Sequence, residues 1–215
     1  MTADCLVRFS GVSFTYQGTD APAIADIDLK IGAGEWIAVL GSNGSGKSTL
    51  AKHFNALLLP TQGDCFVHGL NTKTEEGKRS ARRSVSMVFQ NPENQLIAAV
   101  VEEDVAFGPE NLGLPPEKIR ERVRWALDVS GLGKMARKPV YALSGGQKQR
   151  LALAGAIAQR TPCLVMDEAT TMLDPKGRQD LMAVLSSLHT SGMTLVSITH
   201  RLEEILCCDR CIVLY

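Results

Sequence analysis

WIAVLGSNGSGKST, residues 36–49, joins a short apolar run to a glycine-rich loop that ends in Lys47 and Ser48. An apolar run such as 36–40 is typical of a strand buried on both faces of a parallel sheet. Closely spaced glycines let successive backbone N–H groups turn inward around an anion, and a helix that follows points its positive end at the same place. The spacing Gly41-x4-Gly46-Lys47-Ser48 therefore predicts a phosphate-binding loop, with a glycine-rich turn that merely precedes a helix as the alternative.

Two side chains of this loop carry the chemistry that a nucleotide requires. Lys47 adds a full positive charge toward the outer phosphates, and the Ser48 hydroxyl suits Mg²⁺, which prefers hard oxygen ligands. We expect ATP and Mg²⁺ as the bound groups. The expected nucleotide-binding residues of the loop are Gly41, Ser42, Asn43, Gly44, Ser45, Gly46, Lys47, Ser48 and Thr49.

Further apolar runs predict the rest of an α/β core. They cover residues 85–89, 163–166, 195–199 and 212–215. A helix-like stretch with Leu181 and Leu188 on one side separates two of these runs, and strand–helix–strand alternation implies a mainly parallel sheet covered by helices. The helix after the loop is expected to run from Lys47 to Leu58, because Pro60 follows.

The two remaining regions differ from this core in their hydrophobic periodicity. The first thirty or so residues alternate with a period of two around a turn at 18–22, which predicts an N-terminal antiparallel β subdomain. Residues 91–159 contain two helical patterns, one opened by Pro115-Pro116-Glu117 and one that begins after Ser144, and they predict a helical lobe inserted in the core. Residues 1–215 are expected to form one domain.

Composition excludes several classes of protein. Lys plus Arg and Asp plus Glu number 23 each, so the chain lacks the basic charge typical of nucleic-acid binding, and we expect no nucleic-acid partner. No run approaches the roughly 18–20 apolar residues that cross a bilayer, and Met1–Cys5 does not resemble a signal peptide. A transport role would therefore require membrane-spanning partners. Cys207, Cys208 and Cys211 lack a second pair at zinc-like spacing, so reduced thiols are expected.

A second buried strand ends in two carboxylates, in the sequence Cys163-Leu164-Val165-Met166-Asp167-Glu168. Asp167 is expected to hold Mg²⁺, directly or through water, together with Ser48. Glu168 is expected to orient or deprotonate the attacking water. An apolar strand that ends in Asp-Glu is weak evidence for a catalytic site by itself. The evidence is stronger when the same chain contains a phosphate loop.

The string Leu143-Ser144-Gly145-Gly146-Gln147 forms a second helix start that could approach an anion. Ser144 is a good N-cap residue, and two glycines allow close approach of a backbone. At this point the residues resemble the ABC ATPase family, whose signature is this string. The resemblance implies that Ser144, Gly145, Gly146 and Gln147 act in trans, on the γ-phosphate held by a second subunit. A plain helix cap is the alternative.

The resemblance extends over almost the whole chain and implies further roles. Gln90 matches the glutamine that contacts Mg²⁺ and links the site to the transport partner, and His200 matches the switch histidine at the γ-phosphate. Tyr16 matches the aromatic residue that stacks on adenine. Thr171-Met172-Leu173-Asp174 matches the D-loop, although Thr171 stands where the family usually has Ser. The catalytic residues implied are therefore Glu168, His200 and Gln90.

The segment after Gln90 looks like the ATPase subunits of energy-coupling factor transporters and of cobalt and nickel importers. Asn91–Leu96 and Val101–Gly113 carry this resemblance. It implies a vitamin or metal-ion importer with a second ATPase subunit, identical or paralogous, a transmembrane coupling protein and a substrate-capturing membrane protein. The chain would then lie at the cytoplasmic face of the membrane. The apolar run Leu96–Val101 suits either a groove for a partner helix or packing of the lobe.

Two expectations remain. Subunits of this family normally continue past the last predicted strand, so a C-terminal extension is expected to be missing from the sequence. The alternative functions are an ABC ATPase of another transporter type or a soluble ABC protein without a transport role. Chromosome-maintenance proteins would need a long coiled coil, and translation factors would need two cassettes, and this chain has neither pattern.

Overall fold

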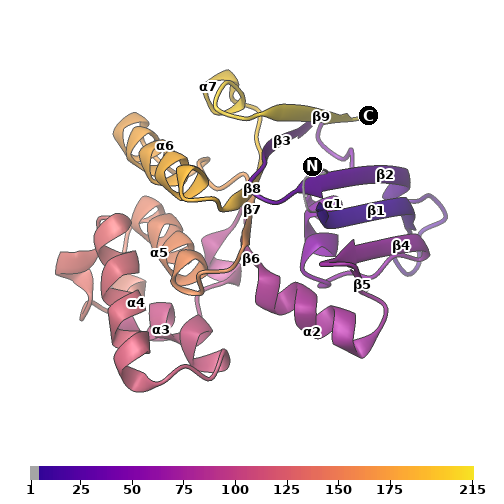
Figure 1. The fold of residues 1–215 in the computed structure, drawn as a ribbon. Helices are drawn as coiled ribbons and strands as arrows, with labels where there is room; N and C mark the ends of the chain where they lie inside the picture. The colour runs from indigo at the N-terminus through magenta and orange to yellow at the C-terminus, as the bar shows by residue number, and fades with distance from the viewer. Residues whose placement is uncertain (1–4) are drawn as a thin grey trace.

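The centre of the molecule is a five-stranded parallel sheet. The computed structural model describes residues 5–215, and residues 1–4, which the signal-peptide expectation concerns, lie outside this range. The strands pair in the order β6-β7-β8-β3-β9, and every pairing is parallel. Their bounds are β3 Trp36–Gly41, β6 Val85–Val88, β7 Cys163–Asp167, β8 Thr194–Ile198 and β9 Arg210–Leu214. Figure 1 shows this sheet nearly edge-on between two layers.

A four-stranded antiparallel sheet forms the second β unit, in the order β2-β1-β4-β5. Its strands are β1 Cys5–Phe14, β2 Ile24–Gly32, β4 Gln62–Val67 and β5 Leu70–Asn71. The pairing of β1 with β2 shifts register between Phe9 and Val12, so both residues are buried although they are three positions apart. The α/β fold class with an antiparallel β unit is confirmed.

Helices cover both faces of the parallel sheet. They are α1 Lys47–Phe54, α2 Glu75–Ser84, α6 Pro175–Thr190 and α7 Leu202–Ile205. The expectation that the first helix continues to Leu58 is wrong. Ala56 adopts a left-handed φ of 56°, and the N–H groups of Leu57 and Leu58 both donate to the carbonyl oxygen of Lys52, so the chain leaves the helix in a tight turn.

The segment 91–159 is helical in the described structure. Its elements are η1 Pro92–Asn94, α3 Val101–Asn111, α4 Pro116–Val129, η2 Gly133–Met135, η3 Val140–Ala142 and α5 Gly145–Ala158. α4 starts at a proline, whose missing N–H is not needed in a first turn, and Gly131 follows its end with a φ of 72°. In Figure 1, α3 and α4 lie on the outer side of α5, away from the sheet.

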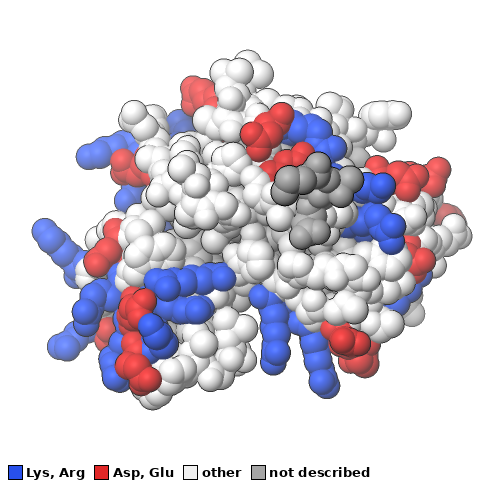
Figure 2. Space-filling view, viewed as in Figure 1, with Lys and Arg blue, Asp and Glu red and all other residues white. Residues whose placement is uncertain are grey.

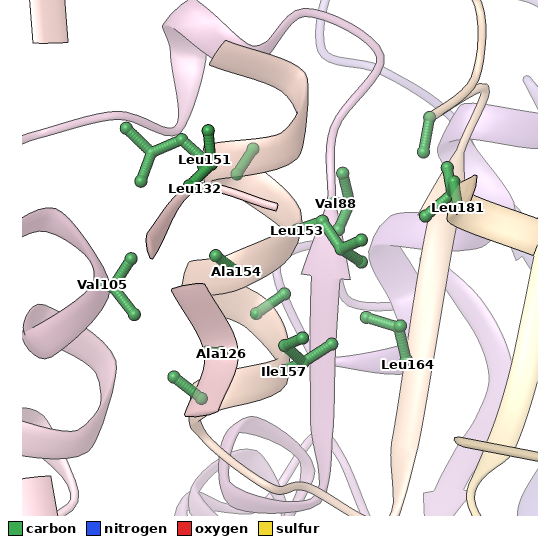
Figure 3. Close-up of a cluster of buried hydrophobic side chains, with 14 of the residues drawn as sticks. Val88, Val105, Ala126, Leu132, Leu151, Leu153, Ala154, Ile157, Leu164 and Leu181 are labelled. Carbon is green, nitrogen blue, oxygen red and sulfur yellow. The ribbon is translucent and has the colours of Figure 1, made fainter. Parts of the chain in front are cut away.

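Alternate residues of the strands belong to two hydrophobic clusters, one on each face of the sheet. Val88, Leu164 and Leu195 face α5, α6 and the outer helices, whereas Val165 and Val196 face α1 and the antiparallel sheet. Figure 3 shows Val105 and Ala126 on one side of α5, and Val88 and Leu164 on its other side. The core is therefore continuous from the outer helices to the sheet.

The charged side chains form a mixed surface. On the face seen in Figure 2, positive and negative groups are interspersed most densely over the outer helices. Two ion pairs lie there, Lys118–Glu121 at 3.0 Å and Arg160–Glu121 at 3.4 Å. Among residues 5–215, no helix is both long and apolar enough to cross a bilayer.

Candidate active site

Four strands bring their carboxyl ends to one edge of the parallel sheet. β3 runs into the glycine-rich loop and β6 is followed by Gln90, while β7 ends at Asp167 and β8 is followed by His200. Because these strands are parallel neighbours, the groups after them lie close together, at the edge where open α/β sheets bind ligands.

The glycine-rich loop is folded around the ammonium group of Lys47. Lys47 Nζ donates to the carbonyl oxygens of Gly41 at 3.0 Å and Ser42 at 2.7 Å, and the side chain is buried. α1 begins at Lys47, and within the described residues no side chain caps it and no acidic group lies in its first turn. Its first N–H groups and Lys47 together suit a phosphate.

Gly46 is required by the shape of this loop. Its φ of 90° lies in the left-handed region, and a Cβ there would collide with the carbonyl oxygen of Ala23 and the side chain of Ile24. The connection between β1 and β2 therefore packs directly against the backbone of the loop.

Asp167 is a buried carboxylate next to this loop. Burial raises the pKa of the Asp167 carboxyl, a hydrogen bond from Ser48 lowers it, and the negative charge of Glu168 raises it again. Asp167 Oδ1 has no hydrogen-bond partner among residues 5–215, which is costly for a buried oxygen. A partnerless carboxylate oxygen beside a hydroxyl fits the oxygen donors that Mg²⁺ prefers.

Glu168 has both carboxylate oxygens engaged by side chains from neighbouring strands. Gln90 Nε2 donates to Glu168 Oε2 at 3.0 Å, and His200 Nε2 lies 3.0 Å from Glu168 Oε1. Glu168 itself has a φ of 50°, and its carbonyl oxygen accepts from the hydroxyl of Thr171 at 2.7 Å and from the Thr171 N–H at 3.1 Å. The three residues expected to be catalytic are thus in direct contact.

Tyr16 lies at the same loop, from the antiparallel side. Its hydroxyl is 3.1 Å from Thr49 Oγ1, and its ring packs edge-on against Phe14 with 4.8 Å between centroids. The ring is 39% exposed. The structure therefore brings Tyr16 to the start of α1, next to the expected phosphate site.

The signature segment forms the N-terminus of α5. Ser144 Oγ accepts from the Gln147 N–H at 3.3 Å and Gln147 Oε1 accepts from the Ser144 N–H at 3.0 Å, which is a complete capping box. A Cβ at Gly146 would lie 3.4 Å from the carbonyl oxygen of Met172, so the signature and the D-loop are adjacent. Asp174 caps α6 by accepting from the Gly177 N–H at 2.8 Å. The roles in trans stay predictions.

Gln95 is a supporting residue that the sequence did not indicate. Its Oε1 accepts from the Phe89 N–H and its Nε2 donates to the carbonyl oxygen of Ala152, both at 3.1 Å. It therefore ties the end of β6, immediately before Gln90, to the signature helix α5. Gln95 stands within the Asn91–Leu96 segment that carried the family resemblance, but no spacing rule assigns it this contact.

Comparison with known proteins identifies the family. A family model described as ABC transporter matches residues 24–171, more than half of the chain. The chain belongs to the ABC transporter family. The energy-coupling factor transporter ATP-binding protein EcfA1 of Caldanaerobacter subterraneus subsp. tengcongensis is 49% identical over 213 residues, which cover 97% of this chain and 77% of that protein.

Solved structures of ABC proteins agree with this assignment. One is cbiO1 from Clostridium perfringens, described as part of the ABC transporter complex cbiONQ, with a TM-score of 0.85 at 36% identity over 98% of this chain and 85% of that one. Another is the ATP-binding cassette MJ0796, a dimer in a post-hydrolysis state bound to ADP and Pi, with a TM-score of 0.88 at 29% identity over 97% and 94%.

The chain is thus an ABC ATPase of the energy-coupling factor type, as the sequence predicted. It binds ATP, and its hydrolysis of ATP is coupled to transport. It is a dimerising ATPase that works with membrane subunits.

Proposed function

We propose that this ABC ATPase closes with a second ATPase subunit on two ATP molecules and so powers the uptake of a vitamin or a transition-metal ion. The contact of Gln90 and His200 with Glu168, beside Lys47 and Asp167, is the observation that carries this proposal. This contact supports the proposal, because phosphoryl transfer requires an acceptor for a water proton next to a site for phosphate charge. The cytoplasmic face of the membrane is the proposed location.

Each polar group of the site has a proposed task. Lys47 holds the outer phosphates, Glu168 orients the attacking water and accepts its proton, and His200 stabilises the γ-phosphate. Tyr16 stacks on adenine, and the signature residues of the second subunit, which correspond to Ser144 and Gly146 here, cover the γ-phosphate from the opposite side. Gln90 links the nucleotide site to the membrane partners.

Ser48, Asp167 and Gln90 are the proposed ligands of Mg²⁺. When bound, the ion neutralises charge on the β- and γ-phosphate oxygens. The partnerless Asp167 Oδ1 supports this assignment, because a cation would satisfy an oxygen that no described residue reaches. Replacement of Asp167 by Asn is therefore expected to weaken binding of Mg²⁺ more than binding of ATP alone.

A groove beside β6 is the proposed contact with the transmembrane coupling protein. It has a volume of about 340 Å³, and its apolar lining includes Leu57, Ile97 and Phe107, each at least 43% exposed. Within the run Leu96–Val101, Val101 is buried in the core, which agrees with packing of the lobe, whereas Ile97 lines the groove, which supports a contact with a partner helix. A partner helix with an apolar face suits this groove, and Gln90 follows the same strand.

The Glu168→Gln variant tests the catalytic assignment. Gln keeps the size of the side chain, but it replaces one carboxylate oxygen by an NH2 group and cannot take up a proton, so the single-turnover rate of ATP hydrolysis is expected to fall at least about 100-fold. ATP binding should persist. The same substitution at the exposed Glu117 on α4 is the control and should hydrolyse ATP normally. Wild-type cleavage by Glu168→Gln would contradict the proposal.

A further inference from the structure

The short helix α7 has an inverted distribution of polar and apolar side chains. Glu204 is only 6% exposed, while Leu202 and Leu206 are 76% and 84% exposed. A carboxylate buried in this way costs free energy unless it is hydrogen-bonded. The helix follows His200 and Arg201 directly, so the orientation of Glu204 concerns the segment that carries the switch histidine.

Among residues 5–215, one short hydrogen bond joins the Glu204 side chain to a distant part of the chain. Thr170 Oγ1 donates to Glu204 Oε1 at 2.6 Å, and Thr170 is also only 6% exposed. This length is typical of a hydroxyl that donates to a charged carboxylate, which is among the stronger hydrogen bonds in proteins. The bond therefore connects α7 firmly to the turn after β7.

Thr170 belongs to the turn that sets the backbone of Glu168. The next residue, Thr171, donates its hydroxyl and its N–H to the carbonyl oxygen of Glu168, which adopts a left-handed φ of 50°. A residue with a side chain at such a φ is held there only by its surroundings. A contact that fixes Thr170 consequently fixes Glu168 as well.

These contacts close a ring that includes Glu168 and His200. The ring runs from Glu168 to Thr170, across the hydrogen bond to Glu204, along α7 to His200, and back to Glu168 through the contact of 3.0 Å. We propose that Thr170 and Glu204 are positioning residues that hold Glu168 and His200 in register for hydrolysis. This inference rests on the roles proposed above for Glu168 and His200.

Thr170→Val, measured in the assembled transporter, tests the inference. Valine keeps the shape of threonine and removes only the hydroxyl. We expect kcat for ATP to fall about tenfold while KM and ATP binding stay within about twofold, because small displacements of reacting groups lower the rate without changing ground-state binding. Thr170→Ser, which restores the hydroxyl, should recover the wild-type kcat.

A double variant separates positioning from stability. Thr170→Val leaves the Glu204 carboxylate buried without its partner, whereas Thr170→Val with Glu204→Met replaces both partners by apolar groups of similar size. We expect the double variant to unfold at the wild-type temperature and still to show the lowered kcat. Thr190→Val is the matched control, because its hydroxyl bonds only the carbonyl oxygen of Ser186 within α6.

Two results would overturn the inference. One is a wild-type kcat in the double variant, and the other is a loss of kcat in Thr170→Val that only parallels loss of folded protein. Glu168→Gln, measured alongside, keeps the two proposals apart. If Glu168→Gln is inactive and the Thr170 variants are normal, only the positioning role is wrong; if Glu168→Gln is active, the catalytic assignment is wrong.

Discussion

Two buried polar side chains near the site, Asp167 and His53, each keep one atom without a partner in the described structure. Asp167 Oδ1 belongs to the carboxylate at the end of β7, which is hydrogen-bonded by Ser48, and His53 Nε2 belongs to a fully buried side chain of α1. The difference lies in their surroundings. Asp167 is next to a hydroxyl and the loop, where a cation would satisfy it, whereas His53 packs edge-on against Phe14 with 5.1 Å between centroids and donates Nδ1–H to the Thr49 carbonyl oxygen in its neutral form.

His53 gives the stability of the chain a predictable dependence on pH. Burial lowers the pKa of the His53 ring below its ordinary value of 6.5. As the pH falls below about 6.5, the ring therefore binds a proton in the unfolded chain and not in the folded chain. The free energy of unfolding then decreases by up to about 1.4 kcal/mol for each unit by which the pH falls. Above about pH 6.5 both states are neutral, and this contribution does not change with pH.

His53→Leu is expected to remove this component. Urea denaturation at about pH 7.5 and pH 5.5 measures the free energy of unfolding, and the decrease between the two should be smaller in the variant than in the wild type. His68→Asn, at an exposed histidine with a φ of 49°, is the control, since asparagine tolerates that backbone conformation. An equal decrease in His53→Leu and the wild type would contradict the assignment.

At the scale of elements, two helix N-termini of the site are built in opposite ways. The N-cap of α1 is Gly46, and the first N–H groups of this helix are free of described side-chain caps, whereas the N-cap of α5 is Ser144, which forms a capping box. Free N–H groups suit a ligand bound within the same subunit. A capped terminus is already satisfied, so α5 is stable when no partner is present, and the Ser144 hydroxyl proton remains able to donate to a phosphate.

Ser144→Ala should have two separable effects. Loss of the cap lowers the free energy of unfolding by about 1 kcal/mol. Loss of the hydroxyl should also weaken ATP-dependent association with the second ATPase subunit, measured by analytical ultracentrifugation in the Glu168→Gln background. Thr74→Ala, which removes the matching cap of α2, should cost similar stability without affecting association. Equal association of the two variants would exclude the role of Ser144 in trans.

Sequence patterns predicted the elements whose signal is local. β3, β6, β7 and β8 are short apolar runs, and each was expected. β4 and α3 were not, because β4 reads as polar residues around Gly63 and α3 contains Gly108 and Pro109, which local rules place at helix ends. Both are stabilised by tertiary contacts, β4 by pairing with β1 and α3 by packing on α5.

The same limit applies to the candidate site. Motif spacing indicated Lys47, the end of an apolar run indicated Asp167 and Glu168, and the family resemblance indicated His200. The structure brings these residues to one edge of the sheet. Spacing could not indicate Gln95 or the bond between Thr170 and Glu204, because these contacts join elements that only the tertiary fold brings together. A buried glutamate in a short helix is not distinguishable from a surface one in the sequence.

At the scale of the whole molecule, the outer helices and the parallel sheet share one hydrophobic cluster. Leu151 on α5 is fully buried within it and lies next to Leu132. A lobe that shares its core with the sheet cannot lose its packing alone without exposing the sheet. The described residues should therefore unfold together.

Leu151→Ala tests this cooperativity. The substitution should lower the free energy of unfolding by about 3 kcal/mol, as expected for a large buried side chain, and unfolding should remain a single transition by both circular dichroism and tryptophan fluorescence. Leu57→Ala, at a side chain that is 49% exposed, is the control and should change stability little. Two separate transitions would show that the helical lobe unfolds independently.

The hydrogen bonds of Lys47 to its own loop have a consequence for nucleotide exchange. An ammonium group has three N–H donors, and Lys47 gives two of them to carbonyl oxygens of the loop, so one donor is left for a phosphate oxygen. The side chain is therefore held in place by contacts that a nucleotide does not have to replace. Release of ADP would leave the buried ammonium with these two bonds, so its charge would not be left without partners.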